Sequence, residues 1–202
     1  MTDSRPQIAF DLDGVLARPP LGFNVAISRH LHTRPLPSDF VKHDSDAARS
    51  QSILKLGFES LKYRGRQALP DAVEGLKAVS QYRRPVIVTA RSWIGKQIID
   101  AWLTRHGMRE YIDDIVPNNT NLSPSMHKLR VARERGFREH VDDDGAVAFY
   151  LAHHDDLDVI YLRTWWLNQG IVFPEKVLRI RTISDIADDL AKRERVPSTR
   201  SD

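Results

Sequence analysis

From residue 70 onward, the chain of 202 residues alternates amphipathic helical patterns with short apolar runs. The short runs predict strands over residues 85–89, 112–116, 139–142 and 157–162. The clearest helical stripe lies between the first two of these strands and consists of Ile94, Ile98, Ile99, Trp102 and Leu103, followed by Gly107. Strands that alternate with helices form a parallel sheet with right-handed crossovers. The sequence therefore predicts an α/β fold with a doubly wound, mostly parallel, Rossmann-like sheet.

The segment from Val15 to Arg66 interrupts this alternation. It contains two helical patterns, "PPLGFNVAISRHLHTRPLP" and "SDAARSQSILKLGFESLKYRG", and no convincing strand. We therefore expect residues 15–66 to form a small helical insertion, and residues 1–14 and 67–194 to form the α/β core. The pattern "SDIADDLAKRER" predicts a last helix, and the polar tail, residues 195–202, is expected to be disordered.

The composition narrows the classes of function. Thirty Lys and Arg residues against 27 Asp and Glu residues leave a net charge of only +3, so binding to nucleic acid is allowed but not indicated. The absence of cysteine excludes disulfides, thiolate catalysis and cysteine-based zinc sites. Eight histidines show no spacing typical of zinc sites, and we interpret His127, His140, His153 and His154 as neutral surface residues.

The hydropathy pattern contains no membrane-spanning segment. Nowhere do about 18 apolar residues follow one another without a charge. The beginning, "MTDSRPQ", lacks the apolar stretch of a signal peptide. We therefore expect a cytoplasmic protein.

Two carboxylates follow the apolar run in "IAFDLDGV", directly before a glycine. Asp11 and Asp13 share one face of an extended chain at the end of the first strand, where open α/β sheets place their active sites. Because two close carboxylates repel each other, the pair predicts a divalent cation, with Mg²⁺ the preferred ion. One carboxylate could then attack phosphorus while the other transfers a proton. The alternative is a strand end closed by a turn, where Asp and Gly are favoured for backbone reasons.

The stretch "VIVTAR" places Thr89, Ala90 and Arg91 at the end of the next strand. A hydroxyl and the following backbone amides at this position can hold a phosphoryl oxygen, because the turn leads into a helix N-terminus. The alternative is a helix-capping threonine beside a surface arginine.

A lysine and three aspartates complete the set of candidate residues. Lys128, in "SPSMHKLRVARERG", lies near the start of a helix and could neutralise a transferring phosphoryl group, although Arg130 competes for this role. In "HVDDDG", three acids end a short strand, and a bound cation would compensate for their burial. One of them, most simply Asp144, could instead cap the next helix.

The ordered set "DLDGV", "VTAR", the lysine of "HKLRVARERG" and "HVDDDG" resembles the four motifs of the haloacid dehalogenase (HAD) superfamily, over residues 8–162. The insertion after the first strand resembles the small helical cap of some members. The run "VTARSWIGKQIIDAWLTRHG" is similar to 5′-nucleotidases and deoxyribonucleotidases.

The resemblance implies a Mg²⁺-dependent phosphatase that acts through an aspartyl-phosphate. Asp11 would be the nucleophile, Asp13 the general acid and base, and Lys128 the charge neutraliser. The metal would be held by Asp11, the backbone carbonyl of Asp13 and Asp143, with Asp142 in the outer coordination sphere. The triple aspartate leaves open whether Asp143 or Asp144 is the direct ligand. The implied substrate-binding residues are Thr89, Ala90, Arg91 and Lys128.

The expected partner is a small phosphorylated metabolite, with a (deoxy)nucleoside monophosphate favoured. A phosphatase acting on nucleic-acid ends and a non-catalytic HAD-like binding module are the alternatives. Arg64 and Arg66, where the insertion rejoins the core, could face an anionic substrate, but we interpret them as a solvated hinge. Trp165 and Trp166 are interpreted as packing residues. The oligomeric state stays open.

Overall fold

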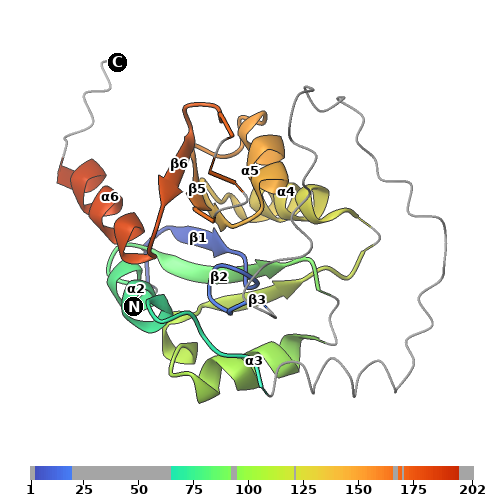
Figure 1. Cartoon of the computed structure of the whole chain (residues 1–202), viewed down its shortest axis with the longest axis vertical. Coiled ribbons are helices and arrows are strands. Elements are labelled where there is room, and N and C mark those ends of the chain that lie inside the picture. Colours follow the sequence, from blue (N-terminus) through green and yellow to red (C-terminus); the bar gives the residue numbers. More distant parts are fainter. Residues whose placement is uncertain are drawn as a thin grey trace.

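The computed structural model describes residues 3–19, 65–91, 95–120, 122–165, 168–169 and 171–195, which include a sheet of six strands (Figure 1). Neighbouring strands follow the order β3-β2-β1-β4-β5-β6, and every neighbouring pair is parallel. The strands are β1 (Gln7–Phe10), β2 (Arg84–Thr89), β3 (Asp114–Pro117), β4 (Glu139–Asp142), β5 (Val159–Arg163) and β6 (Val177–Ile180). The predicted α/β fold with a parallel, Rossmann-like sheet is confirmed.

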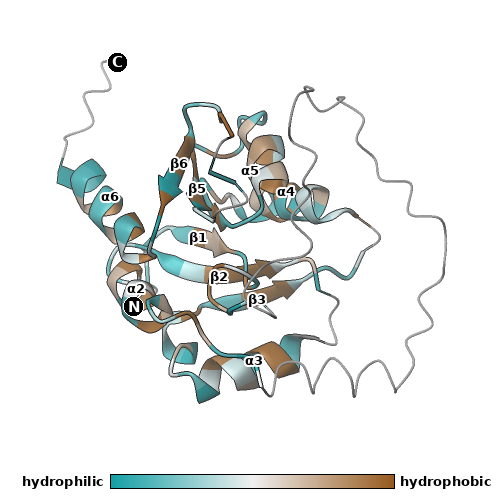
Figure 2. Ribbon diagram, viewed as in Figure 1, coloured by the Kyte–Doolittle hydropathy of each residue, from teal (hydrophilic) through white to brown (hydrophobic). Residues whose placement is uncertain are grey.

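Helices cover both faces of this sheet. They are α2 (Ala72–Val79), α3 (Gly95–Arg105), α4 (Pro124–Arg135), α5 (Gly145–Ala152) and α6 (Ser184–Arg195), with a short 3₁₀ helix, η2 (Arg109–Tyr111), before β3. One buried cluster joins the sheet to α2, α3 and α6, and a second joins it to α4 and α5. Hydrophobic residues concentrate in the strands and on α5, whereas α6 is largely hydrophilic (Figure 2).

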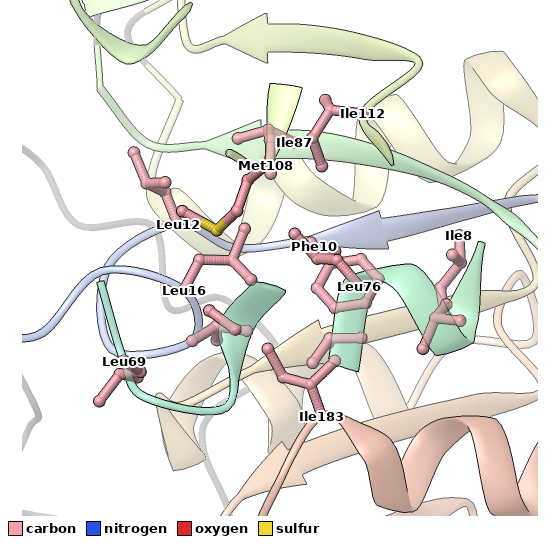
Figure 3. Close-up of a cluster of buried hydrophobic side chains, with 14 of the residues drawn as sticks. Ile8, Phe10, Leu12, Leu16, Leu69, Leu76, Ile87, Met108, Ile112 and Ile183 are labelled. Atoms are coloured by element: carbon pink, nitrogen blue, oxygen red, sulfur yellow. The ribbon is translucent and has the colours of Figure 1, made fainter. Parts of the chain in front are cut away.

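The strands divide their side chains between the two clusters by simple alternation. In β1, Ile8 and Phe10 belong to the cluster with α2, while Ala9 belongs to the cluster with α4 and α5. Figure 3 shows the first of these clusters, in which Phe10 and Ile8 lie close to Leu76. Because both faces are covered, the central strands β1, β2, β4 and β5 are buried on both sides, as expected for a parallel sheet.

The boundaries of most elements agree with the sequence patterns. The strand at residues 139–142 and the last helix, Ser184–Arg195, lie where the patterns predict them. The predicted strand at 112–116 begins later, because η2 occupies the preceding residues. Strand β6 was not predicted, since two of its four residues, Leu178 and Arg179, are exposed at the edge of the sheet and give it no apolar run.

The segments that flank residues 20–64, which we call the stem, are joined by backbone hydrogen bonds. Arg18 N donates to Gln67 O at 2.9 Å, and Leu69 N donates to Leu16 O at 2.8 Å. Leu16 is fully buried in the cluster with α2, so this stem is part of the core. The predicted helical insertion falls mainly on residues 20–64, which lie outside the described residues, and it stays a prediction.

An ion-pair network, which we call the basal network, ties α6 to the amino end of β4. Glu139 accepts hydrogen bonds from Arg83 at 2.7 Å and from Arg193 at 2.8 Å. Arg83 also pairs with Glu194, and Arg193 with Asp189. The network therefore links α6 to the sheet by ion pairs.

No helix in the described part of the chain has the length and apolar character needed to cross a membrane.

Candidate active site

The candidate residues meet at the carboxyl end of the two central strands. Asp11 directly follows β1, and Asp142 is the last residue of β4, its neighbour in the sheet. Asp11 N donates to Val141 O at 2.9 Å, which fixes the two strand ends side by side. The order of the strands reverses between β1 and β4, and such a switch point is where open α/β sheets bind ligands.

Helix α4 delivers Lys128 to these carboxylates. The helix begins after Ser123, whose side chain accepts from Met126 N at 3.4 Å, and it carries Pro124 in its first turn. Lys128 Nζ lies 3.0 Å from Asp11 Oδ1 and 2.7 Å from Asp142 Oδ2, with only 4% of the side chain exposed. The lysine therefore bridges the two strand ends.

The competing cation on α4 does not join this group. Arg130 pairs instead with Glu134 on the same helix, at 3.5 Å. Of the two candidates in this motif, Lys128 is thus the one that the structure places beside Asp11.

Burial and charge shift the pKa values of the three groups in different directions. Burial raises the pKa of Asp11 to about 7, in spite of Lys128, and the neighbouring Asp142 and Asp13 add to the rise. Burial also opposes ionisation of Asp142, but Lys128 and a hydrogen bond from His140 outweigh it and hold the pKa of Asp142 below its usual range. For Lys128, burial is outweighed by Asp11 and Asp142, which raise its pKa. Lys128 and Asp142 therefore favour their charged forms and pair with each other, whereas Asp11 takes up a proton more readily than an ordinary aspartate.

Both carboxylate oxygens of Asp142 are engaged within the protein. Its Oδ1 accepts from Asp144 N at 3.0 Å, and its Oδ2 accepts from Lys128 and lies 2.8 Å from His140 Nε2. His140 is buried in β4, so its interpretation as a surface residue was wrong. The reason is that β4 is covered on both faces, which leaves no exposed position for alternate residues.

Asp143 faces the turn that follows β1. Gly14 in that turn has a φ of 81°, and a Cβ atom built on it would overlap the carboxylate of Asp143. A glycine is therefore required at this position for two reasons, the backbone conformation and the close approach of Asp143.

The third aspartate of the triplet caps a helix. Asp144 Oδ1 accepts from Ala146 N at 2.8 Å and is the N-cap of α5. Burial raises its pKa. This geometry favours Asp143 over Asp144 as a direct metal ligand, which the sequence left open.

The group of Asp11, Asp142 and Asp143, which we call the acidic cluster, fits a divalent cation. One carboxylate oxygen from each residue can be chosen so that all lie within 4.8 Å of one another, and all three residues are buried. Two of the three carboxylates, those of Asp11 and Asp142, share the single ammonium group of Lys128. An all-oxygen donor set made of carboxylates suits Mg²⁺. Both oxygens of Asp142 already accept hydrogen bonds within the protein, so this carboxylate would have to share them with an ion.

The carboxylate of Asp13 points to two arginines instead. Arg91 Nε donates to Asp13 Oδ2 at 2.7 Å, and Arg66 Nη1 pairs with Asp13 Oδ1. The interpretation of Arg66 as part of a solvated hinge was wrong, because only 7% of its side chain is exposed. Arg64 lies outside the described residues.

Thr89 and Ala90 lie where the sequence placed them, at the end of β2. Thr89 is buried, and its Oγ1 accepts from Arg91 N at 3.3 Å, as in the turn that was the alternative interpretation. Ala90 is partly exposed. Phosphate binding by this turn stays a prediction.

A buried asparagine in the segment after β5, to which the sequence assigned no role in the site, supports the site. Asn168 Nδ2 donates to Arg163 O at 2.9 Å and to Asp143 O at 3.3 Å, and its Oδ1 accepts from Trp165 N at 3.0 Å. The only hint in the sequence was a polar residue, Asn168, shortly after two tryptophans. Trp165 packs partly buried against the cluster with α2, whereas Trp166 lies outside the described residues.

Comparison with known proteins gives similarity in structure only. No protein-family model matches the sequence, and a search of curated proteins finds no match. Among solved structures, a haloacid dehalogenase-like hydrolase from Streptococcus pneumoniae matches with a TM-score of 0.60 at 14% identity, over 94% of this chain and 99% of that one. CbbY from Rhodobacter sphaeroides, solved with phosphate, matches with a TM-score of 0.58 at 14% identity, over 90% and 96% of the two chains.

A third neighbour is D,D-heptose 1,7-bisphosphate phosphatase from B. bronchiseptica, solved with magnesium and phosphate. It matches with a TM-score of 0.56 at 12% identity, over 93% of this chain and 99% of that one. At these identities the matches establish that the chain shares the fold of haloacid dehalogenase-like hydrolases.

Proposed function

We propose that this protein is a Mg²⁺-dependent phosphomonoesterase of the haloacid dehalogenase type, acting through an aspartyl-phosphate. One observation carries the proposal: Lys128 lies between Asp11 and Asp142 at the carboxyl end of the central strands, with Asp143 beside them. A nucleophilic carboxylate, a fixed cation and an oxygen-rich cluster in one place are what phosphoryl transfer needs. The fold that the chain shares with such hydrolases supports the same activity.

In the first step, a carboxylate oxygen of Asp11 attacks phosphorus, and the bond from phosphorus to the ester oxygen breaks. Asp13 gives its proton to the leaving oxygen, so the alcohol departs neutral. Lys128 offsets the negative charge on Asp11 and on the transferring group.

In the second step, water attacks phosphorus and Asp13 takes its proton. The bond between phosphorus and Asp11 breaks, which releases inorganic phosphate and restores both carboxyl groups to their starting states.

Asp11, Asp143 and the backbone carbonyl of Asp13 would hold Mg²⁺, with Asp142 in the outer coordination sphere. When bound, Mg²⁺ neutralises charge on the phosphate and on Asp11. Since burial raises the pKa of Asp11 to about 7, the ionised nucleophile depends on positive charge nearby. The remaining phosphoryl oxygens would bind the turn at Thr89, Ala90 and Arg91.

The substrate class favoured by the sequence resemblance is a (deoxy)nucleoside monophosphate. A nucleic-acid end is the second candidate, and the net charge of only +3 weighs against it. A non-catalytic binding module is disfavoured because both Asp11 and Asp13 are present at the end of β1.

A phosphatase screen tests this proposal. Purified protein is incubated with a panel of phosphorylated metabolites, nucleoside monophosphates and 5′- and 3′-phosphorylated oligonucleotides, with Mg²⁺ or with a chelator. Asp11→Asn is the blank. Release of phosphate that needs both Mg²⁺ and Asp11 supports the proposal, and release that persists in the Asp11→Asn protein contradicts the mechanism.

A further inference from the structure

We propose that Arg66 is a positioning residue that, together with Arg91, orients the Asp13 carboxylate for proton transfer. The inference rests on the proposed function, because it gives Asp13 the role of acid and base. It assigns a task to a residue that lies far from Asp13 in the sequence.

Each oxygen of Asp13 has its own guanidinium partner. Arg66 Nη1 pairs with Oδ1, and Arg91 Nε donates to Oδ2 at 2.7 Å. A carboxylate held at both oxygens from two different loops cannot rotate freely about its side-chain bonds. With 23% of its side chain exposed, Asp13 can still meet a ligand.

Arg66 is itself fixed by three other contacts. Its Nε donates to Arg18 O at 2.9 Å, which ties it to the turn after β1. Its own carbonyl accepts from Trp102 Nε1 at 2.9 Å and lies 3.2 Å from His106 Nε2, both on or next to α3. Arg66 therefore connects α3 to the loop that carries Asp13 through hydrogen bonds.

The two arginines differ in their access to a substrate. The side chain of Arg91 is 28% exposed, so it can contact an anionic ligand directly. Arg66 is 7% exposed, and both Nη1 and Nε have protein acceptors. Any effect of Arg66 on turnover is therefore expected to pass through Asp13.

This position also joins Asp13 to the stem, the segments that flank residues 20–64. Arg18 N donates to Gln67 O, directly next to Arg66, and Gly14 N donates to Ala17 O in the turn that carries Asp13. The stem and the acid-base residue are thus parts of one hydrogen-bonded unit.

Leaving-group dependence separates positioning of an acid from binding of phosphate. An activated aryl phosphate, such as p-nitrophenyl phosphate, departs without a proton, whereas an alkyl phosphate needs one. Since kcat/KM reports steps up to departure of the leaving group, a misplaced Asp13 lowers it for the alkyl ester only.

The experiment measures kcat/KM for both esters, using the best alkyl phosphomonoester of the panel. For Arg66→Gln we expect at least a tenfold loss with the alkyl ester and less than a threefold loss with the aryl ester. In an Asp13→Asn background the same substitution should change the alkyl value by less than twofold. Arg133→Gln, which removes a surface pair with Asp156, is the matched control and should leave both values unchanged.

Three results would overturn the inference. They are equal losses with both esters, a full loss retained in the Asp13→Asn background, and an Arg66→Gln protein that behaves like the Arg133→Gln control. If Arg66→Gln does not fold by circular dichroism, Arg66→Lys replaces it. That variant keeps one donor for Asp13 without the second contact to Arg18, and it should show the same selectivity at smaller size.

The test also separates this inference from the proposed function. A wild-type protein that hydrolyses neither ester in Mg²⁺ refutes both. Hydrolysis of the aryl ester that depends on Asp11, combined with any of the three contrary results, refutes only the role of Arg66.

Discussion

The two ends of strand β4 carry buried acidic residues whose charges are compensated to different degrees. At the amino end, Glu139 of the basal network accepts hydrogen bonds from Arg83 and Arg193. At the carboxyl end, Asp142 belongs to the acidic cluster, in which Asp11 and Asp142 share Lys128 and Asp143 lies beside them. The four residues of β4 thus connect a network in which each acid has an arginine partner to a cluster in which two carboxylates share one lysine.

The difference shows which charges stabilise the fold and which impose a cost. In the basal network every acid faces an arginine, and the contacts join α6 to the sheet. In the acidic cluster the carboxylates repel one another, and burial raises the pKa of Asp11 to about 7. Such an arrangement is retained at functional sites at the expense of stability, and a bound cation relieves it.

The largest expected effect is on turnover, from a change in the acidic cluster. Asp11→Asn should abolish phosphatase activity, with a loss of at least about a thousandfold, because the amide cannot attack phosphorus. Without Mg²⁺ its free energy of unfolding should equal or exceed that of wild type, since one repulsive charge is gone. Urea unfolding and kcat measure the two parts. An active variant would contradict the role of Asp11 as nucleophile. A strongly destabilised variant would show that Asp11 stabilises the fold, as the acids of the basal network do.

Binding of Mg²⁺ is expected to stabilise the folded protein through the acidic cluster. At about 100 times its dissociation constant, Mg²⁺ should add about 2 to 3 kcal/mol to the free energy of unfolding. Asp143→Asn should lose most of this gain, whereas Asp189→Asn in the basal network should keep it. Thermal unfolding with and without Mg²⁺ checks the prediction. Equal stabilisation of both variants would place the ion elsewhere.

The candidate residues at the carboxyl edge of the sheet could be predicted from the sequence because local patterns mark them. Asp11 follows an apolar run, Thr89 ends one, and the triple aspartate ends a predicted strand, so the end of each strand also locates the side chain. Lys128 was placed by its position near the start of a helix. The strand order then brings these residues together, since neighbouring parallel strands end at one edge.

The structural roles that the sequence did not predict depend on contacts between distant segments. Arg66 reaches Asp13, and Asn168 reaches the backbone of Asp143, across gaps that no local pattern bridges. Glu139 reads as an ordinary charged residue at a strand start until α6 is packed beside it. For His127 and His140, the surface interpretation failed because tertiary packing buries both of them.

Removing the acid of the basal network should lower stability and spare chemistry. Glu139→Gln leaves Arg83 and Arg193 without a charged partner at this position, and Glu139 is only 5% exposed. Because the arginines keep other partners and partial access to water, we expect a cost of about 2 kcal/mol. The midpoint of urea unfolding measures this cost, and kcat/KM at a temperature where the variant is folded should stay within twofold of wild type. A large fall in kcat/KM with unchanged stability would contradict the assignment of a structural role to the amino end of β4.

The smallest expected effect concerns a buried titratable group outside both networks. Burial lowers the pKa of His127 to about 4, so the folded protein keeps this imidazole neutral where the unfolded chain would protonate it. Its contribution to stability is therefore complete above about pH 6.5, the ordinary pKa of histidine, and is lost as the pH falls toward 4. Between pH 7 and pH 5 we expect the free energy of unfolding to fall by about 1 to 2 kcal/mol, and we expect this fall to be absent from His127→Gln.

Urea unfolding of wild type and of His127→Gln at the two pH values isolates the contribution of His127, because His140 and the acidic cluster are common to both proteins. The exposed His153, changed to Gln, should leave the pH dependence of wild type intact. A pH dependence that survives in His127→Gln would assign the acid sensitivity to the two ends of β4 instead.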